Sequence, residues 1–293
     1  MPTLKKVFKN SIDILLLCGI IEVKKLIFGG IMATKYPIIL VHGIVLKDVK
    51  FFKAFGRIEN VLKAEGHSVY TSTTDGFGSI ETNAAQLKEQ ILEILDKEKA
   101  DKVNLIAHSK GGLDSRYMID CLGMSEHVAS LTFLCTPHKG SVIAEKIDSL
   151  PKLIKGAAAT YLHVCYKIFG DKNPEVLKVC RQLSSKKEDG VSLLLNGETH
   201  SNVFMQSYST TMDKSRDDFV MGIPLIFSRY FGSGDNDGLV SVESSKFAEY
   251  KGNCTDTSVS HSEIVDFMVK KSKREKIYSF YVSLCNDLED RGY

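Results

Sequence analysis

Five short runs rich in apolar residues recur along the chain from residue 37 onward, and longer amphipathic segments separate them. Most of these runs contain few polar residues, which is typical of parallel strands buried on both faces of a sheet. The runs are PIILVHG (37–43), HSVYTS (67–72), KVNLIAH (102–108), ASLTFLCTP (129–137) and VFMQSYS (203–209). They predict the strands of one central sheet.

The segments between and after these runs place apolar residues three or four positions apart, which is the spacing of one face of a helix. They are FFKAFGRIENVLKAEG (51–66), NAAQLKEQILEILDKEKA (83–100), LDSRYMIDCLG (113–123) and KIYSFYVSLCNDLEDRG (276–292). Ser79 or Thr82 could cap the second of these helices. The alternation of strand and helix predicts right-handed crossovers, and therefore an open α/β fold with a mostly parallel sheet flanked by helices.

This regularity breaks over residues 141–197, which hold two apolar helix-like pieces, 143–170 and 174–183. A long helical insertion beside a sheet is often a lid over a functional site. The alternative is that these helices complete the hydrophobic core. The sequence predicts one α/β domain over residues 35–293 with this insertion inside it.

An apolar segment, residues 1–34, precedes the predicted domain. Its run ILLLCGII (14–21) is too short to span a membrane, because a spanning helix needs about 20 apolar residues. The segment is therefore expected to be a membrane-surface helix, an accessory helix packed on the domain, or a cleaved signal.

Composition adds little about partners but bears on location. The 293 residues are 43% hydrophobic with a net charge of +2, which describes a globular protein without electrostatic bias toward nucleic acid. The seven cysteines form no CxxC pair, and the apolar context of Cys121 and Cys135 predicts buried thiols. This cysteine usage favours a reducing compartment, and hence a cytoplasmic or membrane-associated protein, with secretion as the alternative.

Candidate chemistry begins at Ser109, in the stretch AHSKG that follows the apolar run 102–108. Small residues two before and two after a serine let a strand turn sharply into a helix and expose the hydroxyl at the carboxyl end of a parallel strand. Ligands bind at that edge in open α/β sheets. Ser109 is therefore predicted to be a nucleophile, although such a stretch taken alone is more often an ordinary strand-to-helix corner.

A serine nucleophile needs a histidine to accept its proton and a carboxylate to orient that histidine, and in this type of fold the acid precedes the histidine. His200 and His261 are the late histidines outside the predicted insertion. Asp237 lies in the Gly/Asn/Asp loop GSGDNDG, and only His261 follows it. Asp237 and His261 are the predicted acid and base, with Asp235 as the nearest competitor for the acid.

Other interpretations of these residues exist. Asp235 and Asp237 could be turn residues or a calcium-binding pair, and His261 could lie on the surface or begin a helix. The order of serine, acid and histidine along the chain favours the catalytic interpretation of all three.

The backbone amides of Lys110 and Ile44 are the predicted oxyanion hole. The first follows the nucleophile directly, and the second follows the HG pair (42–43) that ends the first strand. His42 is expected to brace its loop, and His108 to be structural. The Lys110 side chain is expected to be incidental.

Taken in order, the stretches YPIILVHGI, VNLIAHSKGGLDSRYM, TPHKGS, NDGLVSVESS and SHSEIVD resemble bacterial triacylglycerol lipases of the Pseudomonas and Burkholderia type, within the α/β-hydrolase superfamily. The resemblance extends from about residue 36 to the end and is weakest in the insertion. It implies an α/β-hydrolase fold, with Ser109, Asp237 and His261 as the triad and the amides of Ile44 and Lys110 as the oxyanion hole.

Two departures from the family pattern concern metal and disulfide. Lipases of this type often bind a structural calcium through an aspartate shortly after the catalytic histidine and another upstream of the acid. Here Glu263 holds the later place and Asp213 is the candidate for the earlier one, so structural calcium remains an expectation of the resemblance. The second half-cystine of the family's disulfide has no counterpart in VSVESSK.

The sequence as a whole predicts a serine carboxylic ester hydrolase that cleaves acylglycerol esters through an acyl-enzyme and requires no cofactor. A lipid ester is the expected substrate, with contact at a membrane or lipid interface and none with nucleic acid. The alternatives are an esterase, phospholipase or acyltransferase with the same triad, or a non-catalytic α/β-hydrolase that acts as a binding module.

Overall fold

A computed structural model describes residues 33–44, 53–168, 170–184 and 202–293 of the chain. The predictions for residues 1–32, for the end of the insertion and for His200 lie outside the described residues. Within them, the predicted α/β architecture is confirmed.

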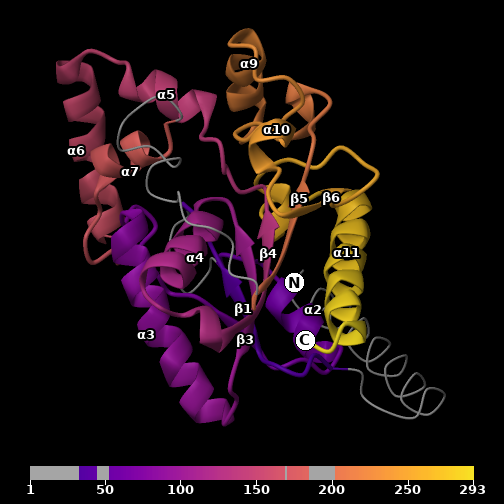
Figure 1. The fold of residues 1–293 in the computed structure, drawn as a ribbon. Coiled ribbons are helices and arrows are strands. Elements are labelled where there is room, and N and C mark those ends of the chain that lie inside the picture. The colour runs from indigo at the N-terminus through magenta and orange to yellow at the C-terminus, as the bar shows by residue number, and fades with distance from the viewer. Residues whose placement is uncertain (1–32, 45–52, 169, 185–201) are drawn as a thin grey trace, which may run out of the picture.

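A six-stranded parallel sheet forms the centre of the molecule, with strand order β2-β1-β3-β4-β5-β6 (Figure 1). The strands are β1 (Ile38–Val41), β2 (Val69–Thr71), β3 (Val103–His108), β4 (Val128–Leu134), β5 (Phe204–Ser209) and β6 (Glu249–Asn253). The first five coincide with the predicted runs, and every residue of β1, β3 and β4 is buried. The edge strand β6, sequence EYKGN, was not predicted.

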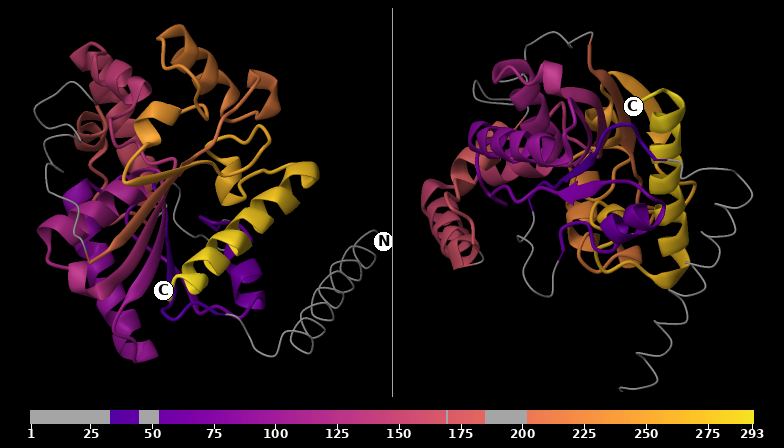
Figure 2. Two further views of the ribbon diagram at one scale, coloured as in Figure 1. Left: turned by 45° about the vertical axis from the view of Figure 1, so that its right-hand side comes forward. Right: turned by 90° about the horizontal axis from the view of Figure 1, so that it is seen from below.

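Helices cover both faces of the sheet (Figures 1 and 2). On one face α3 (Ile80–Glu98) and α4 (Lys110–Cys121) pack on a core that includes Ile39, Leu105 and Leu131. On the other face α2 (Ile58–Ala64) and α11 (Lys271–Asp290) enclose a second core. Alternate residues of β3 enter different cores, Leu105 one and Ile106 the other, as the pleat of a doubly covered strand requires.

The helices α5 (Val142–Asp148), α6 (Lys152–Ile168) and α7 (Val176–Gln182) form the described part of the predicted insertion. They lie at the carboxyl end of the sheet with α9 (Gly222–Tyr230) and α10 (Val242–Ser245), which were not predicted. Short 3₁₀ turns η1 (Ser125–His127), η2 (Ser215–Asp217) and η3 (Glu263–Val265) complete the fold.

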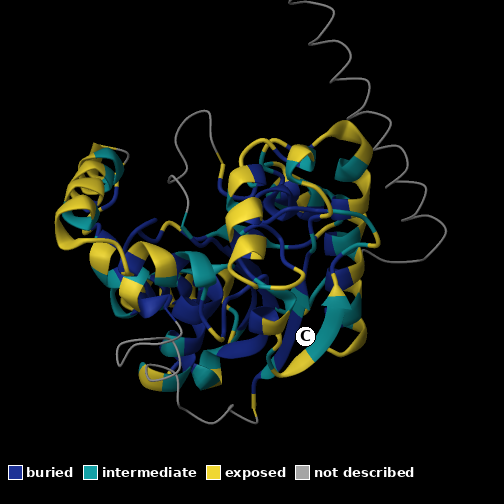
Figure 3. Cartoon of the chain, turned by 90° about the horizontal axis from the view of Figure 1, so that it is seen from above, coloured by how far each residue is buried: buried dark blue, intermediate teal, exposed yellow. Residues whose placement is uncertain are grey.

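The insertion is not uniformly part of the core. Val176, Val179 and Leu183 in and beside α7 are buried against Leu113 of α4. By contrast, Ala159 is the buried residue of α6, whose outer face stands exposed in Figure 3. One end of the insertion therefore completes the core and the other does not.

Two further observations concern the surface and the thiols. None of the helices in the described part of the chain is long and apolar enough to cross a membrane. Cys135 is buried as predicted, but the prediction was wrong for Cys121, which is exposed because it lies at the C-terminal end of α4.

Candidate active site

Ser109 stands at the sharp turn between β3 and α4. Its backbone has φ 55° and ψ −132°, a conformation that side-chain-bearing residues rarely adopt and that costs about 1–3 kcal/mol. Gly111 makes the turn possible, because a Cβ there would lie 2.4 Å from the His42 carbonyl oxygen. The small residue two positions after the serine is therefore required by the close approach of α4 to the end of β1.

Ser109, His261 and Asp237 form one hydrogen-bonded chain. The Oγ of Ser109 lies 2.9 Å from Nε2 of His261, and Nδ1 of His261 lies 2.7 Å from Oδ2 of Asp237. All three side chains come from the carboxyl edge of the sheet. The structure thus brings together the three residues that the sequence analysis selected, which lie as far apart as 152 positions in the chain.

The loop that carries Asp237 fixes this carboxylate. Its Oδ1 accepts hydrogen bonds from the amides of Leu239 and Val240, at 3.0 and 2.8 Å, while Oδ2 is left for the histidine. The Asp237 carbonyl also accepts the amide of His261 at 2.9 Å. The competitor Asp235 instead receives the amide of Val242 on its backbone carbonyl, and it is Asp237 that contacts His261.

The two predicted oxyanion donors lie in adjoining loops. A Cβ built on Gly43, the residue before Ile44, would lie 3.0 Å from the Lys110 nitrogen and 2.8 Å from Cβ of Ser109, so the two loops touch. His42 braces the first loop as expected, because its Nδ1 lies 2.9 Å from the Gly43 carbonyl oxygen. A side chain at residue 43 would therefore collide with the turn that carries Ser109.

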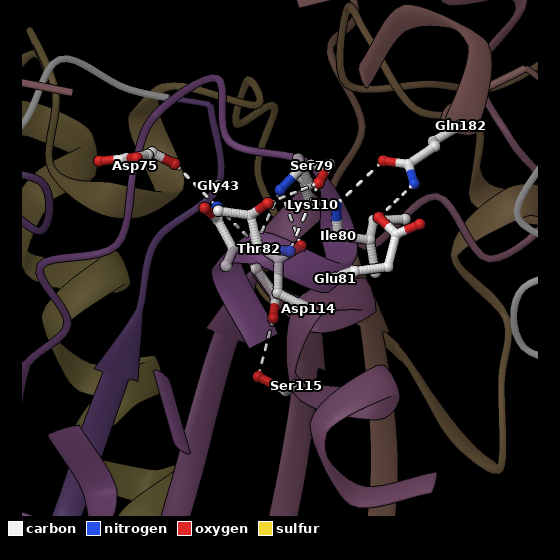
Figure 4. Close-up of polar contacts among 12 residues, drawn as sticks. Gly43, Asp75, Ser79, Ile80, Glu81, Thr82, Lys110, Asp114, Ser115 and Gln182 are labelled. Carbon is white, nitrogen blue, oxygen red and sulfur yellow. Dashed lines mark hydrogen bonds and ion pairs between the residues drawn. The ribbon is translucent and has the colours of Figure 1, made fainter. Parts of the chain in front are cut away.

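The side chain of Lys110 is not incidental, and that expectation was wrong. Its Nζ is fully buried and lies 2.7 and 3.0 Å from the two oxygens of Asp114, one turn later in α4 (Figure 4). Asn83 of α3 also donates to Asp114 at 3.1 Å. Burial raises the pKa of Asp114 to about 6, against the opposing effect of Lys110. The pair fixes the first turn of α4, whose first amide is the predicted oxyanion donor.

Two neighbours of His261 were not assigned to this site from the sequence. The ring of His108 lies 4.5 Å from that of His261, centroid to centroid, and burial lowers the pKa of His108 well below its ordinary value. His108 is therefore a neutral support for the base, which agrees with its predicted structural role. Its position directly before Ser109 is the only sequence signal for this contact.

Cys135, just after β4, is the second neighbour. Its Sγ and ligand atoms of Asp237 and His261 lie within 4.8 Å of one another. Burial raises the pKa of the Cys135 thiol well above its ordinary value, and the Asp237 carboxylate raises it further. The thiol is therefore protonated, and it lies next to the Asp237 carboxylate. Nothing in the sequence around Cys135 signals this position.

The predicted calcium ligands Asp213 and Glu263 do not form an oxygen cage. Glu263 is buried, and its Oε2 lies 2.7 Å from the ammonium of Lys273 and accepts the Ser260 amide at 3.1 Å. Among the described residues, one group of three His, Cys, Asp or Glu side chains has ligand atoms close enough to share a metal ion. It consists of Cys135, Asp237 and His261, and it includes neither Asp213 nor Glu263. Since calcium takes six to eight oxygen ligands, these residues do not fit the ion.

Comparison with known proteins finds lipases and a thioesterase family. The family model for palmitoyl protein thioesterase matches residues 37–174. Triacylglycerol lipase 2 of Saccharomyces cerevisiae is 29% identical over 255 residues, which cover 80% of this chain and 73% of that protein. A triacylglycerol lipase of Burkholderia plantarii is 36% identical over 146 residues, 47% of this chain and 40% of that protein. The chain thus matches less than half of the length of this bacterial relative.

A solved structure shares the fold. The mature form of a Bacillus licheniformis lipase superposes with a TM-score of 0.60 at 20% sequence identity, covering 86% of this chain and 92% of that one. The chain has the α/β-hydrolase fold and is a carboxylic ester hydrolase of the serine type. The relatives named here are triacylglycerol lipases, so the resemblance predicted from the motifs is confirmed.

Proposed function

We propose that the chain is a lipase that cleaves acylglycerol esters through an acyl-enzyme on Ser109. The observation that carries this proposal is the hydrogen-bonded chain from Ser109 through His261 to Asp237 at the carboxyl edge of the sheet. The sequence similarity to triacylglycerol lipases of yeast and bacteria supports the substrate class.

In the first half of the reaction, Oγ of Ser109 attacks the ester carbonyl carbon while Nε2 of His261 takes the hydroxyl proton. The amides of Ile44 and Lys110 donate to the oxyanion of the tetrahedral intermediate. Collapse of this intermediate breaks the bond to the alcohol oxygen, which leaves with the proton held on His261. An acyl ester on Ser109 remains.

In the second half, water attacks the acyl ester and gives its proton to His261. The second tetrahedral intermediate releases the fatty acid and restores the Ser109 hydroxyl. Asp237 accepts a hydrogen bond from Nδ1 throughout, which keeps Nε2 directed at the serine and stabilises the imidazolium that forms in each half. His261 therefore acts as base and then as acid in each half, while Asp237 orients it.

Two exposed apolar surfaces at the carboxyl end of the sheet (Figure 1) support a lipid interface as the place of action. On α6 the exposed side chains include Leu153, Tyr161 and Ile168, and on α9 they include Ile223, Phe227 and Tyr230. α9 is fastened next to the acid loop, because Ser228 Oγ donates to the Gly238 carbonyl at 3.1 Å. Contact of both surfaces with lipid would place the site at the interface.

The test compares one emulsified triacylglycerol with one soluble p-nitrophenyl ester, using the wild type and the Ser109→Ala variant. We expect the wild type to hydrolyse both, with a steep rise once the long-chain substrate exceeds its solubility. Loss of the hydroxyl should lower both rates by at least about 10⁴-fold. Hydrolysis confined to soluble short-chain esters would contradict the lipase assignment and leave an esterase.

A second substrate class is favoured by the match of residues 37–174 to palmitoyl protein thioesterase. A thioester carbonyl reacts with the same serine, and a thiol leaves in place of the alcohol. The two substrates are separated by kcat/KM for palmitoyl-CoA and for a palmitoyl glycerol ester, measured on the same preparation. A ratio that favours the thioester by tenfold or more would reassign the function.

A further inference from the structure

The turn that carries His261 is held on both sides by carboxylates. Asp218 Oδ2 accepts from the hydroxyls of Ser260 and Ser262, the latter at 2.7 Å, which are the two chain neighbours of the histidine. Although burial opposes it, these hydrogen bonds lower the pKa of Asp218. The Ser260 amide donates to Glu263. The turn is therefore built around two buried acceptors.

The second of these carboxylates, Glu263, is neutralised by one lysine from another element. Nζ of Lys273, in the first turn of α11, lies 2.7 Å from Oε2 of Glu263. The side chains are 15% and 3% exposed, whereas Lys276 on the same helix pairs with Asp256 at 45% and 81% exposure. Lys273 is thus much more buried than the solvated Lys276 of the same helix.

This ammonium occupies the position beside Oε2 of Glu263 that a divalent cation would take in order to bind that oxygen. A calcium ion bound through Oε2 would first have to displace both Lys273 and the amide of Ser260. Breaking a buried ion pair by removing one partner is strongly unfavourable, because a charge is left without compensation. The carboxylate oxygens that hold this turn are therefore already paired with groups of the chain itself.

We propose that Lys273 is a built-in cation that holds the His261 turn through Glu263 and makes the enzyme independent of calcium. Lys273 is a positioning residue, since it touches neither the substrate nor the reacting atoms. The proposal rests on the proposed function, because it takes His261 as the catalytic base. It also predicts a property of the folded chain that is measurable without turnover.

The experiment compares Lys273→Met, Lys273→Arg and the matched control Lys276→Met with the wild type, each with a chelator and with excess calcium. We expect the wild type and the control to show the same kcat and the same melting temperature in both media. Lys273→Met should lose at least tenfold in kcat on the soluble ester with little change in KM. Lys273→Arg should recover most of that loss, because it restores the charge.

The melting temperature provides the readout that does not need activity. Without Lys273 the buried Glu263 carboxylate loses its compensating charge, so Lys273→Met should melt at a lower temperature than the wild type and Lys276→Met, while calcium should leave the melting temperature of the wild type unchanged. If Lys273→Met does not fold, a Glu263→Gln variant whose melting temperature ignores both the chelator and calcium would support the proposal.

Three results would overturn the proposal: loss of wild-type stability or kcat on chelation, equal behaviour of Lys273→Met and Lys276→Met, or a Glu263→Gln variant whose melting temperature depends on calcium. A wild type that hydrolyses neither ester would instead contradict the proposed function, and the melting temperatures would still decide the role of Lys273.

Discussion

Asp75 and Asp171 each cap the backbone of the other's loop. The carboxylate of Asp171 accepts the amides of Gly76 and Phe77, both at 2.9 Å. The carboxylate of Asp75 accepts the amides of Lys172 and Asn173, at 2.8 and 2.9 Å. This reciprocal pair joins the loop before α3 to the loop between α6 and α7, so the α7 end of the insertion is fastened to the core.

Replacing Asp171 with alanine should therefore lower the free energy of unfolding by about 3 kcal/mol, since two buried amides lose a charged acceptor. Urea denaturation measures this loss, and limited proteolysis between α6 and α7 should accelerate. The control is Asp287→Ala, which removes an exposed ion pair with Arg291 and should cost less than about 1 kcal/mol. Equal losses in both variants would show that the two loops are not fastened in this way.

Two glycines should respond to alanine in opposite directions. At Gly111 a Cβ would lie 2.4 and 2.7 Å from the carbonyl oxygens of His42 and Val41, so Gly111→Ala must push α4 away from β1 and displace the serine. Gly156 in α6 has nothing within 4 Å of its Cβ position, and Gly156→Ala should stabilise the chain by about 0.5–1 kcal/mol. Thermal denaturation and ester hydrolysis test both, and an active Gly111→Ala enzyme with unchanged melting temperature contradicts the turn geometry.

Buried histidines should make the fold sensitive to acid. Burial lowers the pKa of His138 well below 6.5. The His138 ring stacks on the Phe247 ring, with 4.5 Å between the ring centroids. The unfolded chain therefore binds a proton below pH 6.5 that the folded chain does not. Stability should be fully present above pH 6.5 and fall as pH drops, by up to about 1.4 kcal/mol per pH unit for each such histidine.

Substituting His138 with phenylalanine keeps an aromatic ring there and removes the titration. The slope of unfolding free energy against pH, measured by urea denaturation below pH 6.5, should therefore decrease by up to that amount. The absolute stability at pH 8 is the internal control, because His138 is neutral there in both states. An unchanged slope would mean that folded His138 takes up a proton over this range.

The exposed face of α9 should affect the rate of hydrolysis only when the substrate forms a lipid–water interface. The double variant Ile223→Ser with Phe227→Ser removes two large apolar side chains that are 67% and 54% exposed. We expect at least a tenfold loss on emulsified triacylglycerol, because each buried side chain contributes about 1.5–3 kcal/mol to lipid contact, and no change on a soluble ester. Leu92→Ser on α3 is the matched control. Equal rates on the emulsion would exclude α9 from interfacial contact.

The part of the fold that the sequence predicted is the part in which burial dictates residue type. The strands β1, β3 and β4 are covered on both faces, so nearly every position had to be apolar. The edge strand β6 is half exposed and contains Lys251 and Gly252, so its composition is that of a loop. α9 escaped prediction because most of its apolar residues face solvent, and the strand β6 that follows it has the composition of a loop.

The candidate site likewise has residues that the sequence predicted and residues that it did not. Chain order and small residues around a serine were enough to select Ser109, Asp237 and His261, because the chemistry itself demands those residue types. The supports escaped, since a lysine that pairs inside the fold, such as Lys110 or Lys273, has the same sequence signal as a solvated one. Only long-range packing decides which lysine is buried.

The central claim is that Ser109 is a nucleophile activated by His261, and covalent labelling tests it most directly. The chain should react with a fluorophosphonate, and intact mass followed by peptide mapping should place one adduct on Ser109. The Ser109→Ala variant should take up none, and His261→Ala should react at least about 10³-fold more slowly while keeping the wild-type melting temperature within a few degrees. An unlabelled wild type, or an adduct that persists in Ser109→Ala, would contradict the account.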